Sequence, residues 1–280
     1  MRNIMNGAAL FIIDPQNDFM GNADGTPYEE GSNKAALPVK GGVEDMTRLA
    51  ALIDENRNKI ERIIVTLDTH EVPGKSPVIG HPEYWEDKDG NHPAPFTTIS
   101  DMDYRCRVWM PIKQIHALQL DDQLKKYFDK VGSQMVWPRH CVVESWGHQV
   151  FGPLQQAIKA WQKVTAGEVQ YIRKGMNPNT EQYGVFEAAM PDPNDPTTQF
   201  NIKLLAELAA SPQVLVAGEA LDYCVKTSID QATQYLPQRA IEKFVLLTDC
   251  MSPVDVDGNN TVGRAFLETM EDGGMMLNAA

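Results

Sequence analysis

The sequence predicts an α/β protein of three layers, in which a parallel sheet is covered by helices on both faces. Short apolar segments of strand length recur along the chain and alternate with segments whose apolar residues follow helical spacing. Strands that are apolar on both sides are typical of parallel sheets, because both faces of such sheets are buried. With 280 residues, 42% hydrophobic and 22% charged, the chain is long enough for one large globular domain with additions.

Five apolar segments are expected to form the strands, and four segments are expected to form helices. The strands are predicted at 8–13, 62–67, 169–172, 213–217 and 244–247, and the helices at 43–55, 117–128, 204–209 and 225–234. In the first helix Met46, Leu49 and Ile53 share one face. In an open parallel sheet, ligands collect beyond the carboxyl ends of the strands, so residues that follow these strands are the first candidates for a site.

Two segments are expected to be additions to a single domain that spans residues 1–280. Residues 71–134 form a long insertion whose first half is rich in Pro, Gly, Asp and His, and residues 191–198 form a loop rich in Pro and Asp. Additions of this kind serve as lids or oligomer contacts, although inert surface decoration is an equally good interpretation.

The charge of the chain argues against two classes of partner. A net charge of −13 and a pI near 4.9 repel nucleic acid and anionic lipid surfaces, and no run of Lys and Arg offsets this. No apolar stretch approaches the length of a membrane span, and the N-terminus lacks the layout of a signal peptide. We therefore expect a cytoplasmic protein that binds neither nucleic acid nor membranes.

The four cysteines are expected to be reduced thiols, because they show no CxxC pairing and are too sparse for a disulfide scaffold. Cys106 and Cys250 are expected to be buried as small apolar residues, and Cys141 to pack behind a metal ligand. Cys224 differs because it lies at the turn between a predicted strand and a predicted helix.

Three reactive side chains follow predicted strands and are candidates for covalent catalysis. Asp14 ends the first strand, Lys174 ends the third, and Cys224 opens a helix. Alone, each has an ordinary interpretation: a turn acid, a solvated lysine and a buried thiol. Together they suggest a nucleophilic thiol with Asp14 as general base, and with Lys174 and the helix N-terminus lowering the pKa of the thiol.

Two further motifs carry the residue types of a catalytic metal site. Asp68 and His70 lie in Asp68-Thr69-His70, and His140 lies in Trp137-Pro138-Arg139-His140-Cys141. Asp-x-His alone is a weak pattern, but His140 supplies a third ligand and leaves coordination positions open for water or substrate. Carboxylate and imidazole ligands suit Zn²⁺, Fe²⁺ or Mn²⁺, and the sequence does not select among them.

The chain resembles the nicotinamidase/pyrazinamidase branch of the isochorismatase-like cysteine hydrolases. The matching motifs are IIDPQNDF, DTH, WPRHCV, RKG, GVFEA and GEALDYCV, in the order of the family and across most of the chain. The Asp-x-His motif combined with Trp-Pro-x-His-Cys distinguishes the metal-dependent amidases from metal-free relatives such as isochorismatases.

The resemblance implies a fold, a reaction and a set of roles. The fold would be a six-stranded parallel sheet of Rossmann-like order, often in homo-oligomers. The reaction would convert nicotinamide and water to nicotinate and ammonia through a cysteine thioester, in NAD salvage. The resemblance implies a catalytic triad of Asp14, Lys174 and Cys224, and one divalent ion, most simply zinc, bound by Asp68, His70 and His140. It also implies a non-proline cis peptide between Glu219 and Ala220 and an oxyanion hole formed by the N–H groups of Ala220 and Cys224. The substrate would be bound by Phe19, Trp137 and Gln16.

The chain departs from the family after the DTH motif, which leaves alternatives open. Glu71-Val72-Pro73-Gly74 stands where the family often has a His-Pro continuation, so His81, Glu83 or His92 is a candidate for an additional metal ligand. The insertion at 71–134 is longer than usual. An amidase for another small amide, a carbamoyl compound or a ureide is therefore a second hypothesis. A non-catalytic metal or ligand binder, or a thiol sensor on the same fold, ranks third.

Overall fold

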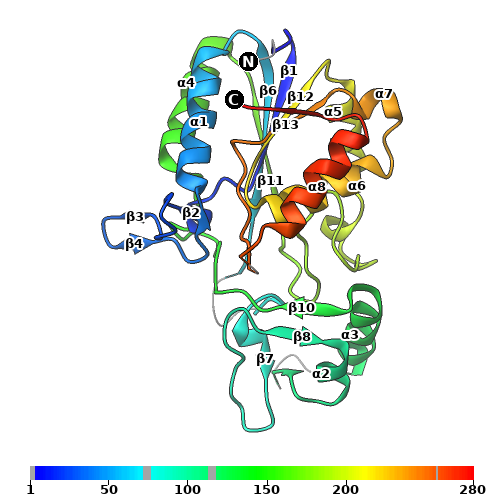
Figure 1. Ribbon diagram of the computed structural model, residues 1–280. Coiled ribbons are helices and arrows are strands. Elements are labelled where there is room, and N and C mark those ends of the chain that lie inside the picture. The colour runs from blue at the N-terminus through cyan, green and yellow to red at the C-terminus, as the bar shows by residue number, and fades with distance from the viewer. Residues whose placement is uncertain (1–3, 72–76, 113–117, 257) are drawn as a thin grey trace.

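The computed structural model describes residues 4–71, 77–112, 118–256 and 258–280, and its centre is a six-stranded parallel sheet (Figure 1). The order is β11-β6-β1-β12-β13-β14, with β1 (Ala8–Ile13), β6 (Ile60–Asp68), β11 (Val169–Lys174), β12 (Val214–Gly218), β13 (Phe244–Leu247) and β14 (Met276–Asn278). The predicted three-layer α/β/α fold and six-stranded sheet are confirmed. The five strands expected from apolar runs agree with the structure to within two residues at each end.

Helices cover both faces of the sheet and alternate residues of β1 contact each layer. Leu10 and Ile12 pack in the cluster under α1 (Gly42–Glu55) and α4 (Gly152–Thr165). Phe11 and Ile13 pack in the opposite cluster, under α5 (Ile202–Ala210), α6 (Lys226–Thr233) and α8 (Thr261–Asp272). Figure 1 shows α1 and α4 together on one side of the sheet and α6 and α8 on the other. A short helix, α7 (Gln238–Ile241), precedes β13.

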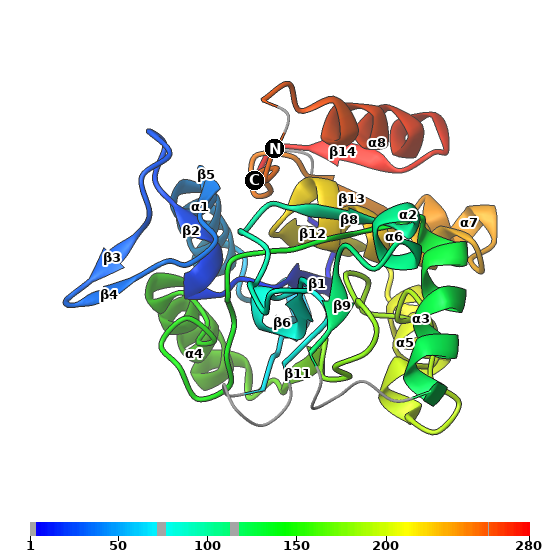
Figure 2. The same ribbon diagram turned by 90° about the horizontal axis from the view of Figure 1, so that it is seen from below.

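The insertion forms a small lobe of its own. It contains β7 (Trp85–Glu86) paired with β9 (Met110–Pro111), β8 (Thr98–Ser100) paired with β10 (Ser133–Met135), α2 (Asp101–Arg105) and α3 (Leu118–Val131). Trp85, Tyr104 and Phe128 form the centre of its apolar cluster. The lobe lies across the carboxyl-terminal edge of the main sheet, as the two views in Figures 1 and 2 show. Residues 72–76 and 113–117 of the predicted insertion lie outside the described residues, and a single domain stays a prediction.

Smaller elements complete the described chain. They are β2 (Met20–Gly21) paired with β5 (Val39–Lys40), the hairpin of β3 (Glu29–Glu30) and β4 (Asn33–Lys34), and turns at Asn17–Phe19, Pro82–Tyr84 and Pro196–Thr198. Across the part of the chain described here, no helix combines the length and the apolar character that crossing a membrane requires.

Of the two cysteines predicted to be buried as small apolar residues, Cys250 agrees with the structure and Cys106 does not. All four are free thiols, and Cys141, Cys224 and Cys250 are buried. The prediction that Cys106 is buried is wrong, because it caps the C-terminus of the short helix α2 on the exposed side of the insertion.

Candidate active site

The three candidate catalytic residues meet at the carboxyl end of the sheet. Lys174 Nζ lies 2.9 Å from Asp14 Oδ2 and 3.5 Å from Cys224 Sγ. The second carboxylate oxygen of Asp14 accepts a hydrogen bond of 2.6 Å from the Thr66 hydroxyl. Asp14, Lys174 and Cys224 are 0%, 2% and 7% exposed, so water does not screen the interactions among them. The structure thus brings the predicted acid, amine and thiol together.

Burial and charge set the protonation states of this group. Burial lowers the pKa of Lys174, but Asp14 and Asp68 outweigh it and hold this pKa well above its usual range. Burial also raises the pKa of Asp14, although the charge of Lys174 opposes the shift. The predicted lowering of the thiol pKa is wrong: burial raises the pKa of Cys224 well above its usual range, and Lys174 opposes this without reversing it. These directions favour a neutral Cys224 thiol.

Cys224 lies in a single π-helical turn, Leu221–Val225, between β12 and α6. The peptide between Glu219 and Ala220 is cis, as the family resemblance implied. Ala220 is buried, and its N–H donates to no acceptor among the described residues. A buried donor that is free in the resting state is suited to hold an oxyanion.

The three candidate metal ligands converge on one point beside Lys174. Asp68 Oδ2 lies 2.9 Å from His70 Nε2 and 3.1 Å from His140 Nε2. The other oxygen, Asp68 Oδ1, lies 3.4 Å from Lys174 Nζ. Ligand atoms at right angles around an ion at 2.0–2.1 Å would lie about 3 Å apart, which these separations match.

The chemistry of this donor set also fits a divalent cation. His70 Nδ1 lies 3.3 Å from the Gly175 carbonyl and His140 Nδ1 lies 2.8 Å from the Pro138 carbonyl, contacts that favour hydrogen on Nδ1 and a lone pair on Nε2. Burial opposes ionisation of Asp68, yet the charges of His70 and Lys174 hold its pKa well below its usual range. Asp68 in turn raises the pKa of His70 against the effect of burial.

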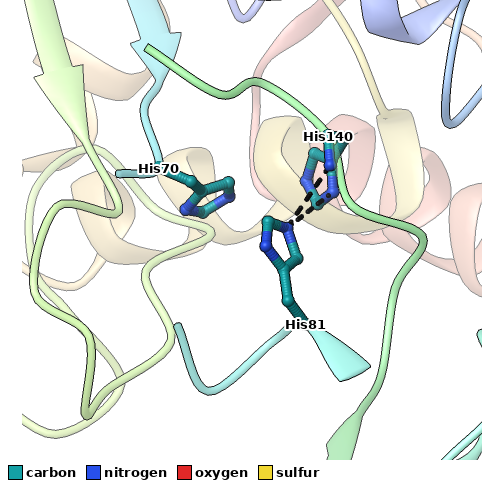
Figure 3. Close-up of side chains that lie close together, drawn as sticks. All are labelled: His70, His81 and His140. Carbon is teal, nitrogen blue, oxygen red and sulfur yellow. Dashed lines mark hydrogen bonds between the residues drawn. The ribbon is translucent and has the colours of Figure 1, made fainter. Parts of the chain in front are cut away.

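His81 is an additional candidate ligand that the structure places beside His70 and His140. Figure 3 shows the imidazole rings of His70, His81 and His140 facing one another, and their nitrogen ligand atoms lie within 4.8 Å of one another. His81 Nε2 lies 3.3 Å from His140 Nδ1, and burial lowers the pKa of His81 well below its usual range. Glu83 instead pairs with Arg139, and His92 contacts the Trp85 carbonyl at 2.6 Å.

An aromatic cavity connects the thiol with the candidate metal ligands. Phe19 and Trp137 line it, as predicted for residues that flank a ring, together with Asp68, His70, His140, Ala220 and Cys224. Tyr183, Tyr223 and Glu181 also line it and were not predicted. Tyr183 precedes the GVFEA motif and Tyr223 precedes Cys224, so adjacency to a motif was the available signal. Trp137 contacts Tyr223 edge to face at 4.8 Å and donates to the Tyr183 hydroxyl at 2.9 Å.

Gln16 lies beside the site, but its side chain is engaged by the backbone of Asp68. Its Nε2 donates to the Asp68 carbonyl at 2.8 Å, and its Oε1 accepts from the Asp68 N–H at 2.8 Å. These contacts favour a role in orienting Asp68, and direct contact of Gln16 with substrate stays a prediction.

The known proteins to which this chain is similar in sequence or structure include nicotinamidases and pyrazinamidases. No family model matches the chain. The curated nicotinamidase of Saccharomyces cerevisiae is 24% identical over 225 residues, which are 80% of this chain and 81% of that protein. A solved structure of the yeast nicotinamidase has a TM-score of 0.59 at 20% identity and covers 98% of this chain and 100% of the other.

Two further solved structures agree. A nicotinamidase and pyrazinamidase of Acinetobacter baumanii has a TM-score of 0.58 at 20% identity over 100% of this chain and 98% of that one. The pyrazinamidase of Pyrococcus horikoshii in complex with zinc has a TM-score of 0.53 at 19% identity over 98% and 99%. The chain has the fold of the nicotinamidases and pyrazinamidases, and its predicted resemblance to this branch of the isochorismatase-like hydrolases is confirmed.

Proposed function

We propose that this protein is a metal-dependent cysteine amidohydrolase that converts nicotinamide and water to nicotinate and ammonia. The observation that carries the proposal is the position of Lys174, whose ammonium contacts Asp14, Cys224 and Asp68 at once. The thiol and the candidate metal site therefore open into one cavity, as a reaction that uses both requires. The relatives named nicotinamidase supply the identity of the amide.

In the first step Asp14 accepts the proton of the Cys224 thiol as sulfur attacks the amide carbonyl carbon. A C–S bond forms and the carbonyl oxygen becomes an oxyanion, which the N–H groups of Ala220 and Cys224 hold. The thiol is neutral at rest, so its proton has to move during the attack, and the raised pKa of Asp14 suits that carboxylate to receive it. Lys174 remains an ammonium and stabilises the developing negative charge.

In the next steps Asp14 returns protons to the groups that leave. It protonates the amide nitrogen, the C–N bond breaks and ammonia departs, which leaves an acyl thioester on Cys224. Asp14 then accepts a proton from water as that water attacks the thioester, and the C–S bond breaks. The departing sulfur takes the proton back from Asp14, which regenerates the thiol and the carboxylate and releases nicotinic acid. The acid gives its proton to the released ammonia, so the final products are nicotinate and ammonium.

Asp68, His70 and His140 would hold the divalent ion, with His81 as a further ligand. When bound, the ion would supply a Lewis-acid position for the ring nitrogen of the substrate. Zinc is our first assignment because carboxylate and imidazole ligands suit it, and Fe²⁺ and Mn²⁺ remain alternatives with the same ligand preference. Phe19 and Trp137 would flank the ring. Nicotinate production would place the protein in NAD salvage, and we expect a cytoplasmic homo-oligomer.

Ammonia release from a panel of amides tests the proposal. The purified protein, loaded with zinc, is assayed with nicotinamide, pyrazinamide, a carbamoyl compound and a ureide, with and without a chelator. We expect the highest kcat/KM with nicotinamide and a large loss on chelation. A higher kcat/KM with a carbamoyl compound or ureide would favour the second hypothesis, and ligand binding without any ammonia release would favour the non-catalytic one.

A further inference from the structure

A second pair of acidic side chains is buried directly behind the oxyanion segment and takes no part in the mechanism above. Asp45 lies in the first turn of α1 and Glu219 follows β12, and they are 3% and 0% exposed. Each carboxyl group acts on the pKa of the other, and the Ser252 side chain also acts on the pKa of Asp45. Glu219 Oε1 lies against the start of α1, 3.5 Å from the point where a Cβ on Gly42 would be.

Two buried carboxyl groups that act on each other disfavour double ionisation, so we expect the pair to hold one proton. Asp45 Oδ2 and Glu219 Oε1 have no hydrogen-bond partner among the described residues, and a proton shared between the two carboxyl groups would supply one. Burial raises the pKa of Asp45, and its ion pair with Arg48 opposes that rise. Burial, and after it the charge of Asp45, raises the pKa of Glu219 well above its usual range, which assigns the proton to Glu219.

Glu219 connects this pair to the oxyanion segment through a closed set of hydrogen bonds. Its Oε2 accepts from the Ser252 N–H at 3.0 Å, and the Ser252 carbonyl accepts from the Leu221 N–H at 2.9 Å. The Glu219 N–H donates to the Ile13 carbonyl at 2.8 Å, one residue before Asp14. Ala220, with its free N–H, lies between these two anchored residues.

We propose that the proton-sharing pair of Asp45 and Glu219 is the positioning element of the oxyanion hole. Glu219 is a positioning residue that acts through Ser252 and the backbone of 219–221, and it does not touch the substrate. The pair joins α1, the end of β12 and the loop after β13 at the point where the N–H of Ala220 has to meet the developing oxyanion. This inference rests on the proposed function for its catalytic consequence, but the shared proton can be measured without any turnover.

Matched variants of Glu219 separate positioning from simple packing. Glu219→Gln keeps the size and both hydrogen bonds, because its amide donates to Asp45 and accepts from Ser252, and should keep kcat close to the wild-type value. Glu219→Leu keeps the volume but removes both bonds, and should lower kcat by about 10- to 100-fold while KM changes little. Asn201→Ala, which removes the N-cap of α5 in the opposite helix layer, is a control for lost stability without lost activity.

Two measurements report the mechanism directly. Infrared difference spectra should contain the carbonyl band of a buried protonated carboxylic acid at neutral pH, which is lost in Glu219→Gln and kept in Asn201→Ala. Pyridine-3-carboxaldehyde should form a covalent adduct in which the Cys224 sulfur is bonded to its carbonyl carbon and its oxygen lies in the oxyanion hole. Its affinity should fall in Glu219→Leu by the same factor as kcat. Affinity for nicotinate, which forms no such bond, should change little.

Each outcome of these experiments either supports or overturns the proposal. A folded Glu219→Leu protein with wild-type kcat and aldehyde affinity, or a wild-type protein without the infrared band, overturns the proposal. If Glu219→Leu does not fold, a Glu219→Gln protein that lacks the band and keeps its aldehyde affinity supports the pair, and one that keeps the band overturns it. If the wild-type protein releases no ammonia from any amide, the proposed function fails, and the band and the aldehyde affinities still decide the pair.

Discussion

The thiol side and the ion side of the cavity are built from different parts of the chain. Asp14 and Cys224 follow β1 and β12, and Lys174 is the last residue of β11, so the arrangement of these strands in one sheet brings the three residues together. On the ion side only Asp68 and His70 follow a strand of the sheet. His81 and His140 lie near the two ends of the insertion, where the chain leaves the main sheet and where it returns.

This difference implies that the two sides respond differently to change. The thiol side keeps its geometry as long as the sheet is folded. The geometry of the ion side depends on the position of the lobe. Backbone hydrogen bonds help to fix that position, for example the one from the His70 N–H to the Cys141 carbonyl at 3.0 Å. A cation bound by His70, His81 and His140 would add a second link between core and lobe.

The largest effect is expected on the thiol side, from Cys224→Ala. Loss of the nucleophile should reduce ammonia release by at least about 1000-fold, because the proposed acyl intermediate forms on the Cys224 sulfur. Zinc content, measured by elemental analysis, and melting temperature should stay near wild type. The exposed Cys106→Ala variant is the matched control and should keep full activity. Retained ammonia release in Cys224→Ala would exclude a cysteine mechanism.

The next effect is expected on the ion side, from metal removal or His70→Ala. Activity should fall by about 100-fold, since a bound cation contributes several kcal/mol to such reactions. Hydrogen exchange followed by mass spectrometry should also become faster in the lobe, at 77–112 and 118–136, and stay slow in β1 and β12. An equal increase in both regions would contradict the division drawn here.

A smaller effect is expected from His81→Ala, which tests whether the insertion contributes a ligand. Zinc affinity, measured by competition with a chelating dye, should weaken by about 10- to 100-fold. His92→Ala is the matched control, because His92 is also in the insertion but contacts the Trp85 carbonyl and not the ligand group. Equal affinities for the two variants would remove His81 from the site.

The smallest effect is expected on stability as a function of pH, on the thiol side of the cavity. Glu219 is protonated in the fold with a pKa above its ordinary value of 4.5, so its contribution is complete below that pH and is lost as the pH rises towards the folded-state pKa. The slope from this group is at most about 1.4 kcal/mol per pH unit. The melting temperature of Glu219→Gln, relative to that of wild type, should therefore rise from pH 5 to pH 9. A difference between the two melting temperatures that does not change with pH would contradict this assignment.

The sequence predicted the parts of the site that follow from strand ends and motifs. Asp14, Asp68 and Lys174 could be placed because parallel strands bring their carboxyl ends to one edge. β14 was not expected from any apolar run, since its three residues are only half-buried. The direction of the thiol pKa was also missed, because it depends on how completely Cys224 is buried and on the charge of Asp68, neither of which spacing reveals.

The aromatic residues of the cavity and the Asp45–Glu219 pair required three-dimensional contacts. Tyr183 lies in a loop whose path depends on packing against Trp137 and Tyr223. Asp45 reads in the sequence as an ordinary acid in the first turn of a helix, a position that acids favour. Nothing in local spacing places it against Glu219, which lies far along the chain.

Partitioning of the acyl group tests the central claim most directly. Wild-type protein is incubated with nicotinamide or with methyl nicotinate in the presence of hydroxylamine, and nicotinohydroxamate and nicotinate are quantified. A common thioester on Cys224 predicts that hydroxamate forms and that its ratio to nicotinate is the same from both substrates. Nicotinate alone, or a ratio that depends on the leaving group, would contradict the account, because water would then attack the substrate without a shared intermediate.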